Sequence, residues 1–311
     1  MARMSESTFL SSDGKTQLFF REYLPDGEAV GIVQLVHGIA EHIARYDGFA
    51  NYLADNGYIV VGHDQLGHGK SVRDSSTLGF FGEKDGWDMA VKDIHALHEL
   101  TAAKYPGKPY FLFGHSMGSF LTRTYLIKYR SGLDGVVISG TGQQSPALIA
   151  GGEVMSALEM RRHGPTFKSE LLNKMAFGSY NSKFKQVRTD TDWLSRDESV
   201  VDLYNSDPLC GFVPSAGLLH DMMGGIKFIS KQKNVNKMNK DLPVLFLSGD
   251  NDPVGEQGKG VMRAYKAFLR AGMKNVTLRL YSGGRHEMLN EINKDEVYQD
   301  ILTWLNGISG R

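Results

Sequence analysis

The pentapeptide Gly114-His115-Ser116-Met117-Gly118 places a serine between two glycines, directly after the apolar run from Tyr110 to Phe113. The pattern alone fits either an ordinary turn capped by serine or a reactive hydroxyl. It lies where a predicted strand meets a predicted helix, which is the setting of a nucleophile elbow. Such an elbow is strained, and flanking glycines avoid clashes that side chains would make. We therefore predict that Ser116 is a nucleophile.

A serine hydroxyl is a poor nucleophile unless a base takes its proton. Of the ten histidines, His286 is the best candidate, because it follows a predicted strand and a Gly-Gly turn near the end of the chain. An acid should orient the imidazole and stabilise its cation. Asp250 and Asp252 both lie just past a core strand, and both could instead form a turn before Pro253. The pattern alone does not choose between them.

Acyl transfer also needs N–H donors for the oxyanion that develops on the substrate. The residue after the nucleophile, Met117, supplies one backbone N–H. The second should come from the loop after an early strand, and the stretch LVHGIAEH places Ile39 there. The neighbouring His37 and His42 are predicted to form structural hydrogen bonds.

These residues must be positioned by an α/β framework, because short apolar stretches alternate with segments of helical periodicity. That rhythm predicts a mostly parallel central sheet with helices on both faces. Strands are predicted over residues 16–24, 31–38, 57–64, 109–114, 133–140, 241–250 and 275–283, and helices over residues 43–57 and about 84–104, 116–130, 256–271 and 294–306.

The rhythm stops after Gly140 and restarts near residue 240. We predict a core formed by residues 1–140 and 240–311, and a helical cap formed by residues 141–239 that covers Ser116. The methionines of the cap suit an adaptable apolar pocket, although most should pack in the cap's own core; they are Met155, Met160, Met175, Met222 and Met223.

Composition excludes several classes of function. Lysine plus arginine and aspartate plus glutamate both number 35, and no basic stripe is present, so a nucleic-acid partner is not indicated. The single cysteine, Cys210, and the absence of a signal-peptide pattern at the N-terminus predict a cytoplasmic protein. No run is long and apolar enough to span a membrane.

The sequence resembles the α/β-hydrolase superfamily, and within it the monoacylglycerol lipase and lysophospholipase branch of the S33 serine aminopeptidase-like hydrolases. The order Ser, Asp, His along the chain is that of the superfamily. The matching stretches span nearly the whole chain; they are VHGIAEHIARYDGFANYLADNGYIVVGHDQLGHGKS, FLFGHSMGS, DPLCGF, LFLSGDNDPVG and GGRHEM.

This resemblance implies an α/β-hydrolase fold with a helical cap, and it assigns the roles that the pattern left open. It implies Asp252 rather than Asp250 as the acid, His286 as the base, and the N–H groups of Ile39 and Met117 as the oxyanion donors. One departure is Ser119, where a second glycine commonly follows the elbow.

Cofactors are not indicated. His63, Asp64 and His68 lie close together in GHDQLGHGKS, but the resemblance makes this stretch a loop bordering the sheet rather than a metal site. No Gly-x-Gly-x-x-Gly or Walker loop follows the first strands, so no nucleotide is expected.

The predicted activity is that of a serine ester hydrolase acting on monoacylglycerol, lysophospholipid or similar small acyl esters. Alternatives are a short-chain or aryl esterase, an aminopeptidase using acidic residues such as Glu153, Glu159 and Glu170, and a non-catalytic binding protein on the same fold. The segment SPALIAGGEVMSAL is apolar enough for transient contact with a lipid surface. Its polar face lacks lysine and arginine, which argues against stable insertion.

Overall fold

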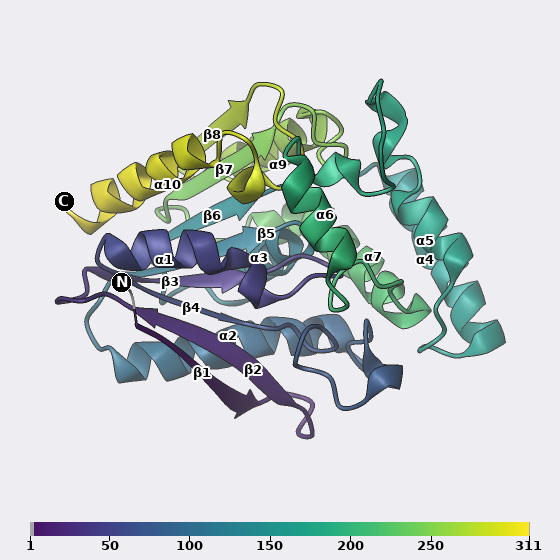
Figure 1. The fold of residues 1–311 in the computed structure, drawn as a ribbon, viewed down its shortest axis with the longest axis horizontal. Coiled ribbons are helices and arrows are strands. Elements are labelled where there is room, and N and C mark those ends of the chain that lie inside the picture. Colours follow the sequence, from purple (N-terminus) through teal and green to yellow (C-terminus); the bar gives the residue numbers. More distant parts are fainter. Residues whose placement is uncertain (1–2, 311) are drawn as a thin grey trace.

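The chain is built around one eight-stranded sheet, and the structure, a computed structural model, describes residues 3–310 (Figure 1). The strand order is β1-β2-β4-β3-β5-β6-β7-β8. β2 pairs antiparallel with β1 and with β4, and the remaining neighbours are parallel. The strands are β1 (Arg3–Leu10), β2 (Gln17–Leu24), β3 (Gly31–Val36), β4 (Tyr58–His63), β5 (Tyr110–His115), β6 (Gly135–Ser139), β7 (Val244–Gly249) and β8 (Val276–Tyr281).

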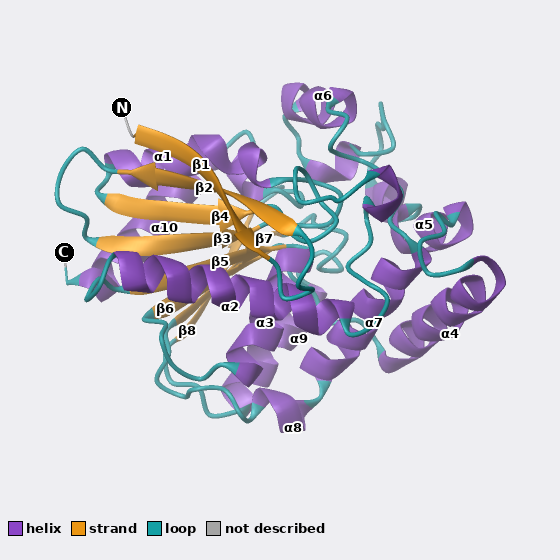
Figure 2. Ribbon diagram, turned by 90° about the horizontal axis from the view of Figure 1, so that it is seen from below, coloured by secondary structure: helices purple, strands orange, loops and turns teal. Residues whose placement is uncertain are grey.

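Helices cover both faces of the sheet (Figure 2). On one face lie α1 (Asp47–Asp55) and α10 (Lys294–Ser309), and on the other lie α2 (Gly86–Lys104), α3 (Met117–Lys128) and α9 (Lys259–Arg270). This arrangement follows from the apolar character of the central strands, which must be buried on both sides. It confirms the predicted α/β-hydrolase architecture.

Strand β5 shows how a continuous apolar run serves two cores. Phe111 and Phe113 pack in the core beneath α1 and α10, whereas Tyr110 and Leu112 pack in the core beneath α2 and α3. All four side chains are buried, because successive residues of a strand point to opposite faces. Packing on both faces therefore fixes the position of β5 and of the turn at its carboxyl end.

Residues 141–239 contain no strand of the sheet among the described part of the chain, and their helices α4 and α5 stand beyond the strands in Figures 1 and 2. Helix α7 packs against α4 and also against α2 and α3, so it joins this segment to the core. The helices are α4 (Pro146–His163), α5 (Glu170–Phe177), α6 (Glu198–Ser206), α7 (Ala216–Ser230) and α8 (Gln232–Val235).

Strand β1 is the element that sequence reasoning missed. It pairs with β2 along its full length, yet nearly all of its side chains are exposed. An edge strand exposed on both faces carries no alternation of apolar and polar residues, so periodicity gave no signal. The other strands and core helices lie within a few residues of their predicted positions.

Candidate active site

Ser116 occupies a strained turn between β5 and α3. Its backbone has φ 53° and ψ −122°, a region that residues with side chains rarely adopt. A Cβ at Gly114 would clash with Thr122 Oγ1, and one at Gly118 would clash with the carbonyl oxygen of Val36. The two glycines therefore let α3 start close against the sheet, as the sequence pattern predicted.

His286 and Asp252 form a buried pair at the same end of the sheet. The Nδ1 atom of His286 lies 3.0 Å from each carboxylate oxygen of Asp252, and both side chains are almost fully buried. Asp252 also accepts the backbone N–H of Val254 at 2.9 Å. The carboxylate of Asp250 instead accepts the N–H of Gly283 at 2.8 Å, which braces the loop after β8.

The second imidazole nitrogen of His286 points to the chemistry that the pair can do. Nε2 is buried and has no hydrogen-bond partner among residues 3–310, and His286 and Ser116 line one cavity. Burial by itself would lower the pKa of His286, but the negative charges of Asp252, Glu287 and Glu41 outweigh burial and raise this pKa above its ordinary value. Such a histidine can accept a proton and hold it.

The predicted donors of the oxyanion site lie beside the serine. Ile39 and Met117 line the same cavity as Ser116. A Cβ at Gly38 would lie 3.0 Å from Ser116 Cβ, so the loop before Ile39 approaches the serine closely. The N–H of Gly38 donates to Glu41 Oε1 at 2.6 Å, which fixes the start of this loop.

A buried ionic cluster that sequence reasoning missed lies next to His286. Arg45 donates to both carboxylate oxygens of Glu287, at 2.6 and 2.7 Å, and to Glu41 at 2.7 Å. Burial alone would raise the pKa of Glu287, but the Arg45 guanidinium lowers it. The signal in the sequence is the spacing of four between Glu41 and Arg45, which suits an ion pair, but nothing in it points to Glu287 as the third member.

A segment between α5 and α6 covers His286. The Trp193 ring lies 5.0 Å from the His286 ring. The backbone N–H of His286 donates to the backbone carbonyl of Trp193 at 3.4 Å. The Glu287 N–H donates to the Leu194 carbonyl at 2.8 Å. Residues 193 and 194 thus hold the loop that carries His286 in place.

The cavity that contains Ser116 has a volume of about 800 Å³. Most of the residues that line it belong to residues 141–239, and the wall as a whole is more apolar than polar. Of the predicted methionines, Met175, Met222 and Met223 line the cavity, whereas Met155 and Met160 pack against the core. The wall also includes Ile149, Leu172, Leu219 and Ile226.

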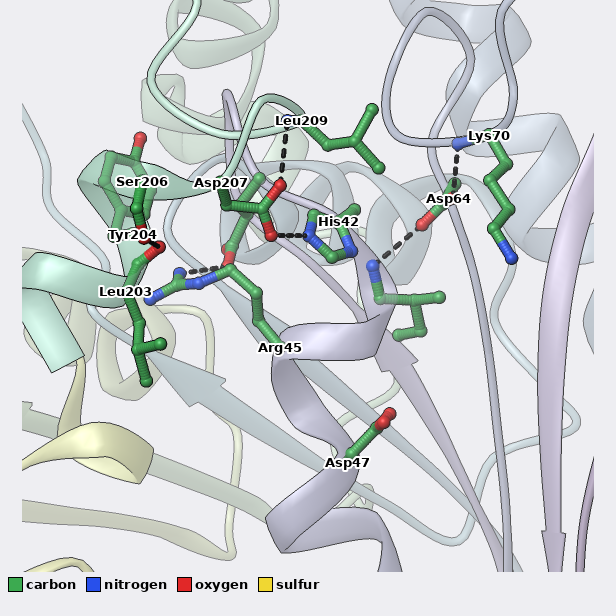
Figure 3. Close-up of polar contacts among 12 residues, drawn as sticks. His42, Arg45, Asp47, Asp64, Lys70, Leu203, Tyr204, Ser206, Asp207 and Leu209 are labelled. Carbon is green, nitrogen blue, oxygen red and sulfur yellow. Dashed lines mark hydrogen bonds and ion pairs between the residues drawn. The ribbon is translucent and has the colours of Figure 1, made fainter.

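The histidines near the first loop have structural partners, as predicted. His37 Nδ1 donates to the Gly38 carbonyl at 2.7 Å, and its Nε2 accepts the N–H of Gln65 at 2.8 Å. His42 Nε2 lies 2.9 Å from Asp207 Oδ2 (Figure 3).

The stretch around Asp64 is also engaged in holding backbone. Asp64 accepts the N–H of Ile43 at 2.8 Å and that of Lys70 at 2.7 Å (Figure 3). Burial lowers the pKa of His63 to about 3, and that of His68 to about 4. Both imidazoles are therefore neutral core residues at neutral pH. Cys210 is buried as well.

Comparison with known proteins places this geometry in a family. A family model described as serine aminopeptidase, S33, matches residues 27–293. The chain belongs to the S33 serine aminopeptidase family. The predicted family is thereby confirmed.

Relatives within this family are ester hydrolases. The chain is 29% identical to the monoglyceride lipase of Mus musculus, over 96% of this chain and 89% of that one. It is 28% identical to the monoacylglycerol lipase of Mycolicibacterium smegmatis, over 97% and 96% of the two chains. The crystal structure of a carboxyl esterase from Bacillus coagulans in complex with glycerol superimposes with a TM-score of 0.92, at 30% identity over 99% of both chains.

The chain is therefore an ester hydrolase of the carboxylesterase type, EC 3.1.1, in the monoacylglycerol lipase branch. The predicted enzyme class is confirmed. No helix within residues 3–310 combines the length and the apolar character needed to cross a bilayer.

Proposed function

We propose that the protein hydrolyses monoacylglycerols, and related small acyl esters such as lysophospholipids, through an acyl-enzyme formed on Ser116. The observation that carries this proposal is the buried contact between His286 Nδ1 and Asp252, at 3.0 Å, because His286 also lines the cavity that holds the strained Ser116. Asp252 favours the tautomer in which Nε2 is unprotonated and can act as a base.

In the acylation step, His286 Nε2 takes the proton of Ser116 while the oxygen of Ser116 attacks the ester carbonyl. The negative charge that develops on the carbonyl oxygen is stabilised by the N–H groups of Ile39 and Met117. His286 then gives the proton to the leaving alcohol. Asp252 stabilises the imidazolium between these two transfers.

In the deacylation step, His286 takes a proton from water, and the resulting hydroxide attacks the acyl-enzyme carbonyl. The fatty acid leaves and Ser116 recovers its proton from His286. Apart from the ester and the water molecule, these steps use side chains and backbone groups of this chain.

The cavity supports an acyl chain as the recognised part of the substrate. Its volume of about 800 Å³ lies within the range of small-molecule sites, and its wall is mostly apolar. The relatives from Mus musculus and Mycolicibacterium smegmatis are named for monoacylglycerol hydrolysis. The similarity to the Bacillus coagulans carboxyl esterase favours short acyl esters as the second candidate.

The aminopeptidase alternative has less support from the acidic side chains that it would need. Glu153 forms an ion pair with Lys227 at 2.6 Å, and Glu159 accepts the hydroxyl of Ser169 at 2.6 Å. Neither they nor Glu170 contribute to the cavity wall. An ammonium group in the cavity would therefore not meet the carboxylates proposed for it.

The test measures purified protein against p-nitrophenyl esters of increasing chain length, a monoacylglycerol and an aminoacyl anilide. We expect the highest kcat/KM on a medium or long acyl ester and no turnover of the anilide. An optimum at acetate or butyrate would make the short-chain candidate correct.

The matched variant is Ser116→Ala, which we expect to lower kcat by about 10⁴-fold or more. Thermal unfolding should show a folded protein, since the substitution only removes the hydroxyl oxygen and leaves a methyl group in place of the hydroxymethyl group. Full activity of this variant, or an inactive wild type, would contradict the proposed function.

A further inference from the structure

The loop that carries Ile39 contains a strained residue of its own. Ala40 has φ 53°, in the left-handed region that residues with a Cβ seldom adopt. A strained backbone persists only where surrounding contacts over-determine it. The contacts that hold residues 38–42, the oxyanion loop, therefore bear on the position of the Ile39 N–H.

The contacts of Ala40 and His42 come from one distant segment, residues 204–211, at the end of α6 and in the loop after it. The Ala40 carbonyl accepts the N–H of Gly211 at 2.9 Å and the hydroxyl of Tyr204 at 3.0 Å. Two residues further on, His42 Nε2 meets Asp207 at 2.9 Å (Figure 3). The segment thus contacts the oxyanion loop through hydrogen bonds at both Ala40 and His42.

Tyr204 is the side chain at the centre of this contact. It is buried, it lines the cavity of Ser116, and its ring lies 4.8 Å from the guanidinium carbon of Arg45. Burial raises the pKa of its hydroxyl well above the ordinary value, so the hydroxyl remains a donor at neutral pH. Arg45 in turn binds Glu287, the neighbour of the histidine.

Asp207 is held in its ionised form by the same contact. Burial alone would raise its pKa, but the hydrogen bonds from His42 and from the Leu209 N–H lower it. The Leu209 N–H lies 2.8 Å from Asp207 Oδ1, so Asp207 orders its own loop while it holds His42 (Figure 3).

We propose that residues 204–211, and Tyr204 in particular, position the oxyanion loop by holding Ala40 in its left-handed conformation. This inference rests on the proposed function, because it assigns the Ile39 N–H to the oxyanion. Tyr204 acts through Ala40 and is a positioning residue. Residues 204–211 thereby hold the oxyanion donor of the core in position. The rate of the chemical step should therefore depend on them more than substrate binding does.

The test replaces the hydroxyl with Tyr204→Phe, which removes one of two donors to the Ala40 carbonyl. We expect kcat to fall about threefold to tenfold, as the loss of one hydrogen bond implies, while KM stays within about twofold. An alkylboronic acid, which forms a tetrahedral adduct on a nucleophilic serine, should inhibit the variant more weakly by the same factor as kcat/KM falls.

Tyr58→Phe is the matched control. Tyr58 is fully buried at the start of β4, and its hydroxyl donates to Asn306 at 2.9 Å, at the end of the sheet away from Ser116. Both variants lose a buried tyrosine hydroxyl and should unfold at lower temperature, but only Tyr204→Phe should lose kcat and boronic-acid affinity. A kcat equal to that of the control, or a rise in KM with unchanged kcat, would overturn the inference.

Asp207→Asn provides a second variant, which weakens the grip on His42 and leaves the Tyr204 hydroxyl intact. We expect the same pattern, with lower kcat and weaker boronic-acid inhibition and little change in KM. Unchanged kcat in Asp207→Asn would restrict the segment to a structural role and contradict the proposal. Failure of the proposed function is recognised separately, by an inactive wild type or an active Ser116→Ala.

Discussion

Two aspartates in one loop have different contacts, from which different roles are expected. Asp252 lies against His286 Nδ1, whereas Asp250 accepts the N–H of Gly283. We expect Asp252→Asn to lower kcat by about 10⁴-fold, because the amide favours the wrong tautomer of His286. Asp250→Asn should keep activity within about threefold and lower the free energy of unfolding by roughly 1 kcal/mol.

Steady-state rates and denaturant unfolding of both variants check this prediction. The Asp250→Asn variant is the internal control, since it makes the same chemical change two residues away. Greater loss of activity in Asp250→Asn than in Asp252→Asn would reverse the assignment of the acid.

The ionisation of His286 sets a second prediction. A base must be unprotonated, so kcat/KM should rise with pH, and the midpoint of this rise should lie above the ordinary histidine pKa of about 6.5. Glu287→Gln removes a negative charge that raises this pKa, so the midpoint should move to lower pH. The profile of kcat/KM against pH for an uncharged ester measures the shift.

Glu28→Gln is the control for that profile, because Glu28 is an exposed partner of Lys108 in the loop before β3, at the end of the parallel strands opposite Ser116. Its midpoint should equal that of the wild type. An unchanged midpoint in Glu287→Gln would mean that the buried cluster leaves the histidine's pKa untouched.

Single residues differ in how far the sequence alone could assign them. Ser116 and His286 follow from local patterns, a glycine-flanked turn and a loop after a strand. The choice of Asp252 needed the family resemblance, because two aspartates in one loop look alike without coordinates. The contact of Arg45 with Glu287 joins residues far apart in the chain, and only the topology of the sheet brings them together.

The junction of β5 with α3 makes a prediction about packing. A Cβ at Gly118 would clash with backbone oxygens at the end of β3, and backbone cannot move aside as a flexible side chain can. We expect Gly118→Ala to lower the free energy of unfolding by about 1–3 kcal/mol and to reduce kcat by displacing Ser116. Gly307→Ala is the control, since an added Cβ in α10 meets nothing within 4 Å.

The control variant should change the free energy of unfolding in the opposite direction. Gly307 is an exposed helical residue, and alanine there should raise the free energy of unfolding by roughly 0.5–1 kcal/mol. Denaturant unfolding of the two variants gives both values. A neutral Gly118→Ala would show that the start of α3 can move away from β3.

Elements were predictable where burial requires a recognisable apolar pattern in the sequence. The runs that became β3, β5 and β7 are buried throughout, and their apolar character reveals them. The exposed β1 left no such signal. The helices of residues 141–239 were recognised only as helical pieces, and how they enclose Ser116 depends on contacts such as that of α7 with α3.

The positions of the exposed apolar side chains indicate where an apolar substrate would enter the cavity. Most of the large apolar side chains that remain exposed lie within residues 141–239. Leu148 and Met175 are 61% and 52% exposed and also line the cavity of Ser116, so they lie at its mouth. Because monoacylglycerol, the proposed substrate, dissolves in lipid, we expect these apolar side chains at the mouth, the rim, to make transient contact with a lipid surface.

A double variant, Leu148→Gln with Met175→Gln, tests whether this rim contacts a lipid surface. Loss of about 1 kcal/mol of apolar burial at a lipid surface should lower kcat/KM on monoacylglycerol in phosphatidylcholine vesicles by about fivefold. Hydrolysis of water-soluble p-nitrophenyl acetate should stay within about twofold, since the residues of the chemical steps are unchanged. Leu100→Gln, at an exposed leucine of α2, should leave both rates as they are. An equal loss on both substrates would assign these side chains to the cavity wall instead of a lipid surface.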